Sequence, residues 1–508
     1  MLPLIKATLL ASILAAAAGV SLGHPNSLRK IHRAFANLAS RTWLCLLILA
    51  LLPITLRLAL LPWLPPPVPR VHDEFSHLLV ADTLAHGRLA NPTHPFWRHL
   101  ETNYVLHQPA YASKYPPGIG ASMALGQSLT GHPWAGVLLT IGLFCALSFW
   151  MLLGWLSPSW AFLGGLLISL RFGFLHYWAE SYWGGGVAAL GGAIAFGSLA
   201  RLWSTKSPRY AALLVAGWGL IWFTRPYEAA VCAVLLTPLI LKPFFRSGIR
   251  TMAASLAPAI LVGLAIGAFF FYYNWRITGS PWTMPYQLYQ QKYGVPQNFL
   301  WQDMVRGPVP EKKNLAATFD WQQKEYLRHK PFSAFLRTSA AYLPELCDFY
   351  AGYLGRGLPL LLLCWPPLWR RNPWIPILLL ILGLSFLASL LYPFRQPHYL
   401  AHYASVWALL LVFSLQFLWH WSPASRPIGR ILVLALIATT WFQKWKAPED
   451  NWREWSQVRA NIADELHRAG NQHLVFVTYS QDHNMYKEWV SNAADIDNSP
   501  IVWAQPID

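Results

Sequence analysis

Residues 71–118, VHDEFSHLLVADTLAHGRLANPTHPFWRHLETNYVLHQPAYASKYPPG, form a long polar stretch between two apolar runs. The stretch begins with an acidic pair, Asp73 and Glu74, and ends with Lys114 shortly before two prolines. A run of roughly twenty apolar residues crosses a bilayer once, so a polar stretch between two such runs is a loop outside the membrane. We expect this loop to gather the reactive side chains of the chain.

The composition indicates a membrane protein. Of 508 residues, 55% are hydrophobic and only 12% are charged, which is more apolar surface than one water-soluble core can hide. The net charge of +17 would suggest a nucleic-acid partner in a soluble protein, but here the cations lie in short segments between apolar runs. In that position they set membrane orientation. The sequence therefore predicts an all-α polytopic membrane protein that has membrane lipids around it and no nucleic-acid partner.

Twelve apolar runs are candidate membrane spans. The first competes with a signal peptide, and we favour a retained helix followed by a basic cytoplasmic segment, so that 1–41 is one unit. Apart from the turn at 157–159, every predicted inner loop is basic, as the positive-inside rule requires. The candidate runs are 2–22, 43–63, 133–155, 159–176, 185–202, 210–224, 227–241, 252–272, 355–369, 374–392, 399–419 and 430–445.

Three polar regions meet on the predicted outer face. The first loop, 64–132, is expected to contain a surface helix at 73–86 that stops at Gly87, and a second large loop covers 273–335. Both belong to a transmembrane domain at 42–446. The remaining segment, 447–508, reads as a small α/β unit with a helix at about 451–469 and strands at 473–480 and 500–504.

The acidic pair has two interpretations. Asp73 could cap the helix and Glu74 could favour its dipole, and acids at helix starts are common enough to make this an even alternative. A carboxylate beside an apolar wall can also act as a general base that deprotonates a hydroxyl. Adjacent residues on a helix point about 100° apart, so only one of the two can face a cavity.

Histidines are frequent in the first loop, and His77 follows Asp73 at the i, i+4 spacing of a two-ligand metal site. The other histidine spacings match no ligand pattern, so solvated loop histidines are the favoured interpretation. A divalent cation, Mg²⁺ or Mn²⁺, would more readily bridge Asp73 to a phosphate.

Cations that suit a phosphate lie at two distant positions. Lys114 stands in SKYPPG, where prolines stiffen the chain at headgroup depth. Arg395 lies in YPFRQPHY between two spans, where a guanidinium can bind phosphate with two hydrogen bonds, and His398 and Tyr399 follow it. An interfacial anchor is the alternative role for each cation.

Ionisable residues near the outer ends of spans usually face a cavity or a partner. Candidates for lining a cavity are His72, His77, Arg171, Glu180 and Arg225. The motifs of P-loop, serine hydrolase, zinc peptidase and dinucleotide-binding enzymes do not occur in the sequence.

The order of these features resembles that of GT-C glycosyltransferases, with family 39, the protein O-mannosyltransferases and the lipid A aminoarabinose transferases as the nearest likeness. The resemblance rests on Asp73-Glu74 after the first long span, on Lys114-Tyr115-Pro116-Pro117, which has a Tyr inserted into the Lys-Pro-Pro element, and on Arg395 to Leu400 before a late span. It covers roughly 43–445 and implies a GT-C-like helix bundle.

The resemblance further implies a polyprenyl-phosphate sugar as the donor and transfer on the extracytoplasmic side of a bacterial inner membrane. Asp73 would be the base or would position the acceptor, and Lys114 and Arg395 would hold the donor phosphate. We further expect Glu74 to orient Asp73 or to contact a metal, and His398 and Tyr399 to join the phosphate site. The acceptor could be a protein, a lipid or a glycan. Two other classes stay open, namely a transporter for a lipid-linked sugar and a non-enzymatic envelope-assembly scaffold that docks through 447–508.

Overall fold

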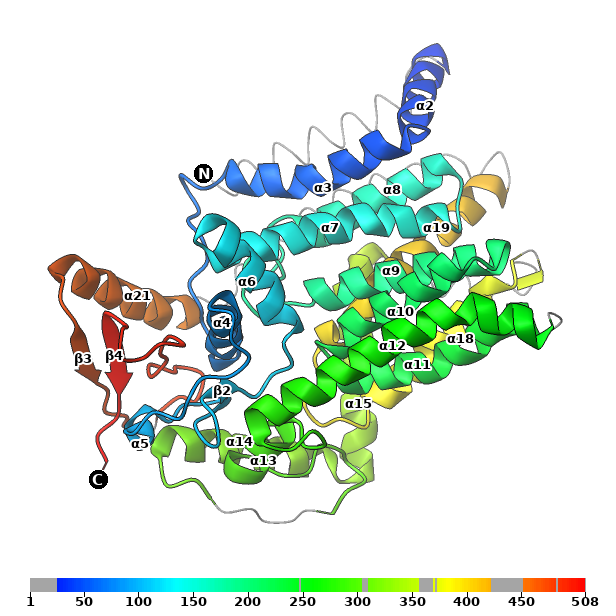
Figure 1. Cartoon of the computed structure of the whole chain (residues 1–508). Helices are drawn as coiled ribbons and strands as arrows, with labels where there is room; N and C mark the ends of the chain where they lie inside the picture. Colours follow the sequence, from blue (N-terminus) through cyan, green and yellow to red (C-terminus); the bar gives the residue numbers. More distant parts are fainter. Residues whose placement is uncertain are drawn as a thin grey trace.

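The computed structural model describes residues 25–245, 248–303, 309–355, 369–370, 372–421, 451–480 and 483–507. Figure 1 shows long helices lying side by side in one bundle, with the polar segments gathered at one end of it. The fold in the described residues is thus mostly helical, as predicted.

The chain enters the bundle through two helices at a sharp angle. Helix α2 (Pro25–Ala39) and helix α3 (Thr42–Leu58) are bent by 92° relative to one another. Near the end of α3 the fully buried Arg57 donates to Glu180 over 2.5 and 3.0 Å and to the carbonyl groups of Leu64 and Pro65. A buried charge must be paired and hydrogen-bonded, so this ion pair fixes where the first loop leaves the bundle.

Several neighbouring helices of the bundle are joined by short turns, as between α7 and α8, α9 and α10, and α10 and α11. Proline stands at the first position of several of them, where its missing N–H costs no hydrogen bond. The helices are α7 (Pro133–Leu153), α8 (Pro158–Ile168), η1 (Ser169–Gly173), α9 (Gly186–Thr205), α10 (Pro208–Trp222), α11 (Pro226–Leu241), η2 (Lys242–Phe244), α12 (Ile249–Thr278), α15 (Phe332–Gly355), α18 (Trp374–Ser389), η3 (Pro397–Tyr403) and α19 (Ala404–Trp421).

Five described helices are long and apolar enough to cross a membrane, and the bent α2–α3 pair brings the number to six. They match the predicted spans 43–63, 133–155, 185–202, 227–241, 252–272 and 399–419. Three further predicted spans, 159–176, 210–224 and 374–392, overlap helices of 11, 15 and 16 residues, and the last of these, Trp374–Ser389, is a shorter apolar helix. The predicted spans at 2–22, 355–369 and 430–445 lie outside the described residues or almost wholly so, and the total of twelve stays a prediction.

Tryptophans join the helix ends that the sequence places on the inner side. The ring of Trp374 lies 4.9 Å from that of Trp155 and 4.7 Å from that of Trp203, and Trp203 donates to the Leu239 carbonyl over 2.8 Å. The ends of α7, α9 and α11 and the start of α18 therefore meet at one end of the bundle. This agrees with the alternation predicted from the basic loops.

At the other end lie the short elements of the polar regions (Figure 1). The first loop contains α4 (His72–Ala85), α5 (Trp97–Leu100), the antiparallel pair β1 (Val105–Leu106) and β2 (Ala112–Ser113), and α6 (Gly118–Thr130). The second contains α13 (Pro285–Tyr293) and α14 (Lys313–His329). The C-terminal unit has α21 (Asn451–Ala469) and two parallel strands, β3 (His473–Phe476) and β4 (Ile501–Ala504).

A buried carboxylate joins these three regions. Glu488 accepts hydrogen bonds from the Asn103 side chain at 2.9 Å, from the Asn314 side chain at 3.1 Å and from the Tyr479 hydroxyl at 2.5 Å. Hydrogen bonds to a charged acceptor are the stronger kind. The C-terminal unit is thus held against both large loops.

One expectation about local structure is wrong, and one helix is not predicted from the sequence. Helix α4 exists where predicted and ends before Gly87, whose φ is +69°, but it does not lie on a surface with one apolar face. It is buried around most of its circumference because α6 packs on it and the ring of Phe75 lies 6.3 Å from that of Trp455. In addition, most of α15 covers a stretch to which the sequence assigned no element.

The Gly184–Gly186 run serves packing. A Cβ on Gly185 would come within 2.6 Å of Ala401 and of the Trp178 ring, so only glycine allows this approach.

Candidate active site

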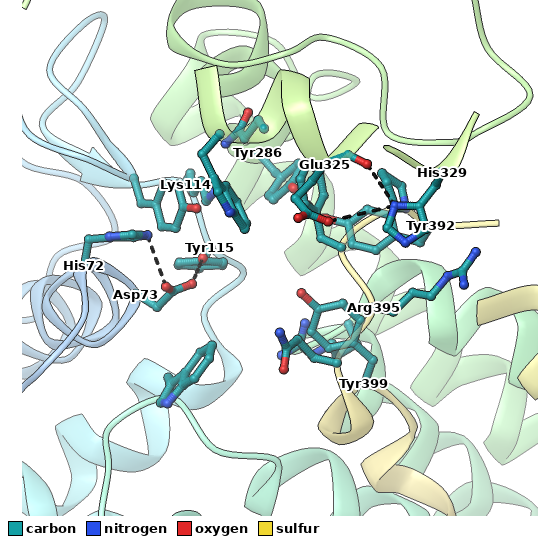
Figure 2. A pocket seen from close by; sticks show the side chains of 18 of the residues that line it. His72, Asp73, Lys114, Tyr115, Tyr286, Glu325, His329, Tyr392, Arg395 and Tyr399 are labelled. Atoms are coloured by element: carbon teal, nitrogen blue, oxygen red, sulfur yellow. Dashed lines mark hydrogen bonds and ion pairs between the residues drawn. The ribbon is translucent and has the colours of Figure 1, made fainter. Parts of the chain in front are cut away.

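A cavity of about 470 Å³ lies at the end of the bundle where the polar regions gather. Asp73, Lys114, Arg225 and Arg395, which stand far apart in the sequence, all line it. Figure 2 shows Asp73 and Lys114 on one side of the cavity and Arg395 with Glu325 on the other. The fold thus brings the Asp73 carboxylate and the Lys114 and Arg395 cations into one cavity, while their roles stay predictions.

Asp73 faces the cavity from the first turn of α4. Its carboxylate accepts a hydrogen bond from the Tyr115 hydroxyl and lies 3.4 Å from Nε2 of His72 (Figure 2). Burial raises the pKa of Tyr115 well above its usual range, with the charge of Asp73 acting in the same direction, so the phenol stays a donor. The helix N-terminus favours a carboxylate here, and 19% of the side chain remains exposed to the cavity.

Glu74 does not line the cavity, which answers the question of which acid faces it. Its side chain is 2% exposed, and burial raises the pKa of Glu74 to about 8, against the opposing charge of Arg70. A carboxyl with that pKa is protonated at neutral pH. The expectation that Glu74 takes part in catalysis therefore finds no geometric support.

Lys114 is enclosed by tyrosine rings. Its ammonium lies 3.1 Å from the ring centroid of Tyr104 and 4.8 to 5.1 Å from those of Tyr115, Tyr286 and Tyr289. Ring faces attract a cation. Burial nevertheless lowers the pKa of Lys114 to about 7, with the Asp73 carboxylate opposing that shift. A small change in local charge can thus switch this group between charged and neutral.

The histidines of the first loop do not form a metal site with Asp73. His77 stacks on Tyr115, 4.3 Å between centroids, and burial lowers its pKa to about 3. Among the described residues no group of three or more His, Cys, Asp or Glu side chains could hold a metal ion. The favoured interpretation, solvated loop histidines, is wrong for His72, His77 and His107, which are 2 to 5% exposed. A divalent cation that bridges Asp73 to a phosphate stays a prediction.

Arg395 lies on the opposite side of the cavity. Its guanidinium donates to the hydroxyls of Thr338 at 3.3 Å and Ser339 at 3.1 Å and to the Leu390 carbonyl at 2.9 Å. These bonds to α15 and to the end of α18 fix its orientation. Arg395 is therefore a positioned cation of the cavity wall.

Arg225 occupies the junction between this cavity and a second, mainly apolar cleft of about 210 Å³. Its guanidinium lies 4.0 Å from the ring centroid of Tyr399, and both residues line both spaces, as does Lys114. The cleft continues along Phe270 and Tyr273 of α12. Because α12 is largely exposed along its apolar length, the cleft adjoins a surface suited to lipid.

The structure does not bring all predicted residues to the cavity. His398 is buried, packs edge-on against Trp183 at 5.0 Å, and is absent from the cavity lining. Arg171 donates to the carbonyl groups of Asp348 and Phe349, and Glu180 pairs with Arg57. These residues hold helices together, whereas His72, His77, Arg225 and Tyr399 do line the cavity.

Several other residues that line the cavity are not identified from the sequence. Trp321, Glu325 and His329 come from α14, and Tyr486 comes from the C-terminal unit. The i, i+4, i+8 spacing of the three α14 residues is a sequence signal for one shared helix face. No comparable signal marks Tyr486.

No model of a known protein family and no curated protein matches this sequence. Among solved structures, the chain is similar to the apo oligosaccharyltransferase of Archaeoglobus fulgidus, with a TM-score of 0.51 and 12% sequence identity over 86% of this chain and 62% of that chain. A structure of the oligosaccharyltransferase AglB from the same organism, in complex with an inhibitory peptide and a dolichol-phosphate, gives a TM-score of 0.49 at 12% identity and the same coverage.

The chain thus spans less than two thirds of the length of these neighbours. The likeness is one of overall architecture. It shows a shared fold alone, and the predicted relations to the GT-C class, to family 39 and to the O-mannosyltransferases stay predictions.

Proposed function

We propose that this chain is a multi-pass membrane glycosyltransferase that moves a sugar from a polyprenyl-phosphate carrier to an acceptor hydroxyl. The observation that carries the proposal is the junction of two spaces. A polar cavity with the Asp73 carboxylate opens into an apolar cleft, and Lys114 and Arg225 line both. A polyprenyl-phosphate sugar fits this arrangement: its sugar would lie in the polar cavity, its phosphate beside the two cations and its hydrocarbon chain in the apolar cleft.

In the proposed reaction, Asp73 accepts the proton of the acceptor hydroxyl as the oxygen attacks the anomeric carbon of the sugar. The bond between that carbon and the phosphate oxygen breaks, and the phosphate leaves with the electron pair. Lys114 and Arg225 stabilise the charge on the departing phosphate. Tyr115 holds the Asp73 carboxylate in place through its hydroxyl.

The charge state of Lys114 suits such a donor. With a pKa of about 7 the amine is only partly protonated in the free protein. A phosphate placed beside it favours the ammonium form, so binding of the donor and protonation of Lys114 support each other. Arg225 stays charged throughout, because a guanidinium keeps its proton in proteins.

The proposed donor site differs in part from the expected one. We keep Lys114 and Tyr399 in the proposed phosphate site and add Arg225, because all three line the cleft. Arg395 lines only the polar cavity, so we assign it to the sugar or the acceptor side and not to the phosphate. His398 is left out because it reaches neither space.

The fold and the distribution of charge favour an enzyme over the two other classes. The overall architecture is that of a chain described as an oligosaccharyltransferase. The ionisable residues that line the cavity lie at one end of the bundle, whereas transporters commonly bind at the midplane between inverted repeats. A scaffold would need no acid and cations facing each other in a cavity.

The test is mass spectrometry of the lipids that co-purify with the full chain. Wild-type protein is expected to carry polyprenyl phosphate or its sugar ester, and Arg225→Ala to carry roughly tenfold less, the effect of losing about 1.4 kcal/mol of charge-assisted binding. Arg276→Ala is the matched control, because Arg276 is exposed near the end of α12 and lines neither space. Equal lipid content in wild type and Arg225→Ala would contradict the proposed donor site.

A further inference from the structure

A row of aromatic rings, here called the aromatic wall, extends from the Asp73 side of the cavity to the opposite side, and the proposed transfer chemistry does not use it. It consists of His72, Tyr486, Trp321 and Phe394, all of which line the cavity. The ring centroids of successive members lie 6.0, 6.2 and 5.3 Å apart, with the His72–Tyr486 and Trp321–Phe394 pairs stacked. The aromatic wall therefore runs from the residue before Asp73 to the residue before Arg395.

Helix α14 adds polar groups beside this wall. Trp321, Glu325 and His329 follow one another at four-residue spacing and line the same cavity. The Glu325 carboxylate accepts a hydrogen bond from Arg328 at 3.2 Å, and Figure 2 shows Glu325 and His329 on the side of the cavity opposite Asp73. An aromatic face with a carboxylate one helical turn away offers an apolar surface and hydrogen-bond acceptors side by side.

This combination matches the two kinds of surface on a sugar ring. The C–H groups on the face of a pyranose carry a slight positive charge and pack on the electron-rich face of an indole or phenol. The hydroxyls at its edge donate to carboxylates. A peptide backbone would instead need paired N–H and C=O partners along the wall, and the wall consists of rings.

The position of the wall separates it from the donor lipid. Lys114, Arg225 and Tyr399 belong to both the polar cavity and the apolar cleft, whereas no member of the aromatic wall lines the cleft. The lipid side and the wall thus lie at different parts of the cavity. Given the proposed function, the side away from the lipid is where the acceptor enters.

We infer that the aromatic wall binds a sugar ring of the acceptor, so that the acceptor is a carbohydrate or the glycan part of a glycoconjugate. The C-terminal unit takes part directly, because Tyr486 stands two residues before Glu488. The Glu488 carboxylate is buried and bonded to Asn103 and Asn314 of the two large loops. These bonds position Tyr486 over the cavity.

The experiment is saturation-transfer difference NMR on the full chain in lipid nanodiscs, with the methyl α-glycosides of glucose, mannose, galactose and N-acetylglucosamine as probes. We expect ring-proton signals for at least one glycoside with wild-type protein. Trp321→Ala and Tyr486→Ala should reduce them roughly fivefold, the usual worth of an aromatic contact. Trp321→Phe and Tyr486→Phe should keep most of the signal because they keep the stacking face.

Trp301→Ala is the matched control, since Trp301 is an exposed tryptophan of the same large loop and does not line the cavity. Its signals should equal those of wild type. A loss in Trp301→Ala as large as in Trp321→Ala would overturn the inference, and so would a loss in the two Phe variants as large as in the Ala variants.

A second titration with undecaprenyl phosphate on the same samples separates this inference from the proposed function. Wild-type protein that binds undecaprenyl phosphate but none of the four glycosides would overturn the inference and leave the function standing.

If Trp321→Ala lost undecaprenyl phosphate and glycoside binding equally, the wall would belong to the donor and the inference would be wrong. If wild type bound an unmodified Ser/Thr peptide at this wall in place of glycosides, a protein acceptor would replace the carbohydrate. Absence of undecaprenyl phosphate binding in wild type would refute the proposed function itself.

Discussion

The two sides of the cavity are assembled in different ways. The Asp73 side comes from one continuous stretch, because His72, Lys114 and Tyr115 belong to the same loop. The opposite side combines Trp321 of α14, Arg395 of a turn between two bundle helices, and Tyr486 of the C-terminal unit. The first side presents the group proposed for catalysis, and the second presents flat rings and polar groups suited to selection of a substrate. In the proposed function, the catalytic group thus lies on a local scaffold, and the groups that select the substrate come from distant segments.

The largest expected effect comes from substituting the two neighbouring acids of the first loop, Asp73 and Glu74, one at a time. Asp73→Asn removes the proposed base while keeping the size of the side chain, and general bases contribute about 10²- to 10⁴-fold to rates. Glu74→Gln changes a buried carboxyl that is already protonated at neutral pH, so its activity should stay near that of wild type. Both are measured as sugar transfer from radiolabelled polyprenyl-phosphate sugars into membranes of source cells that lack their own copy of the protein.

A properly folded Asp73→Asn protein with full activity would remove Asp73 from catalysis. If Glu74→Gln lost activity as completely as Asp73→Asn, the distinction between an acid that faces the cavity and one that does not would be wrong.

The second effect concerns pH and the donor. Burial lowers the pKa of Lys114 to about 7, so in the free protein it is mostly charged at pH 6 and mostly neutral at pH 8. The anionic donor binds the charged form better, and its Kd should therefore rise with pH, by up to about tenfold per pH unit above the pKa. Lys114→Arg stays charged across this range and should flatten the profile. Titration of undecaprenyl phosphate by intrinsic fluorescence from pH 6 to 8 checks this, and equal slopes for the two proteins would contradict it.

The smallest effect concerns the contact that joins the two sides. Glu488→Gln replaces an acceptor-only carboxylate with an amide that turns a donor toward Asn103, Asn314 or Tyr479. We expect a loss of about 1 to 3 kcal/mol in unfolding free energy, seen as a lower apparent Tm, with a modest fall in transfer rate. Glu465→Gln, on the exposed face of α21, is the control and should leave the Tm unchanged. A Tm for Glu488→Gln equal to that of the control would show that the carboxylate does not hold the segments together.

The contrast between the two sides also explains what the sequence could and could not predict. Local sequence patterns predict two helices of the polar regions. The helix expected at 73–86 is α4, His72–Ala85, and the helix expected at 451–469 is α21. Apolar runs and the basic segments between them predict most of the described bundle helices. These features depend on residues close together in the chain.

Features that depend on distant contacts were missed. The burial of α4 follows from packing against α6 and the C-terminal unit, and a 14-residue window contains neither. The partners of Arg171 and Glu180 could not be known, so both were assigned to a cavity that they do not line. The sequence indicates Arg225 as a cavity-lining residue and not as a phosphate ligand, because its place at the junction of cavity and cleft exists only in three dimensions.

The most direct test of the central claim is an electron cryomicroscopy structure of the full chain in nanodiscs with undecaprenyl phosphate. The account predicts phosphate density in contact with Lys114 and Arg225, with the hydrocarbon chain in the apolar cleft beside α12 and the Asp73 carboxylate facing the same cavity. Phosphate density at the opposite end of the bundle, near Trp155, Trp203 and Trp374, or a hydrocarbon chain that leaves the cleft empty, would contradict it.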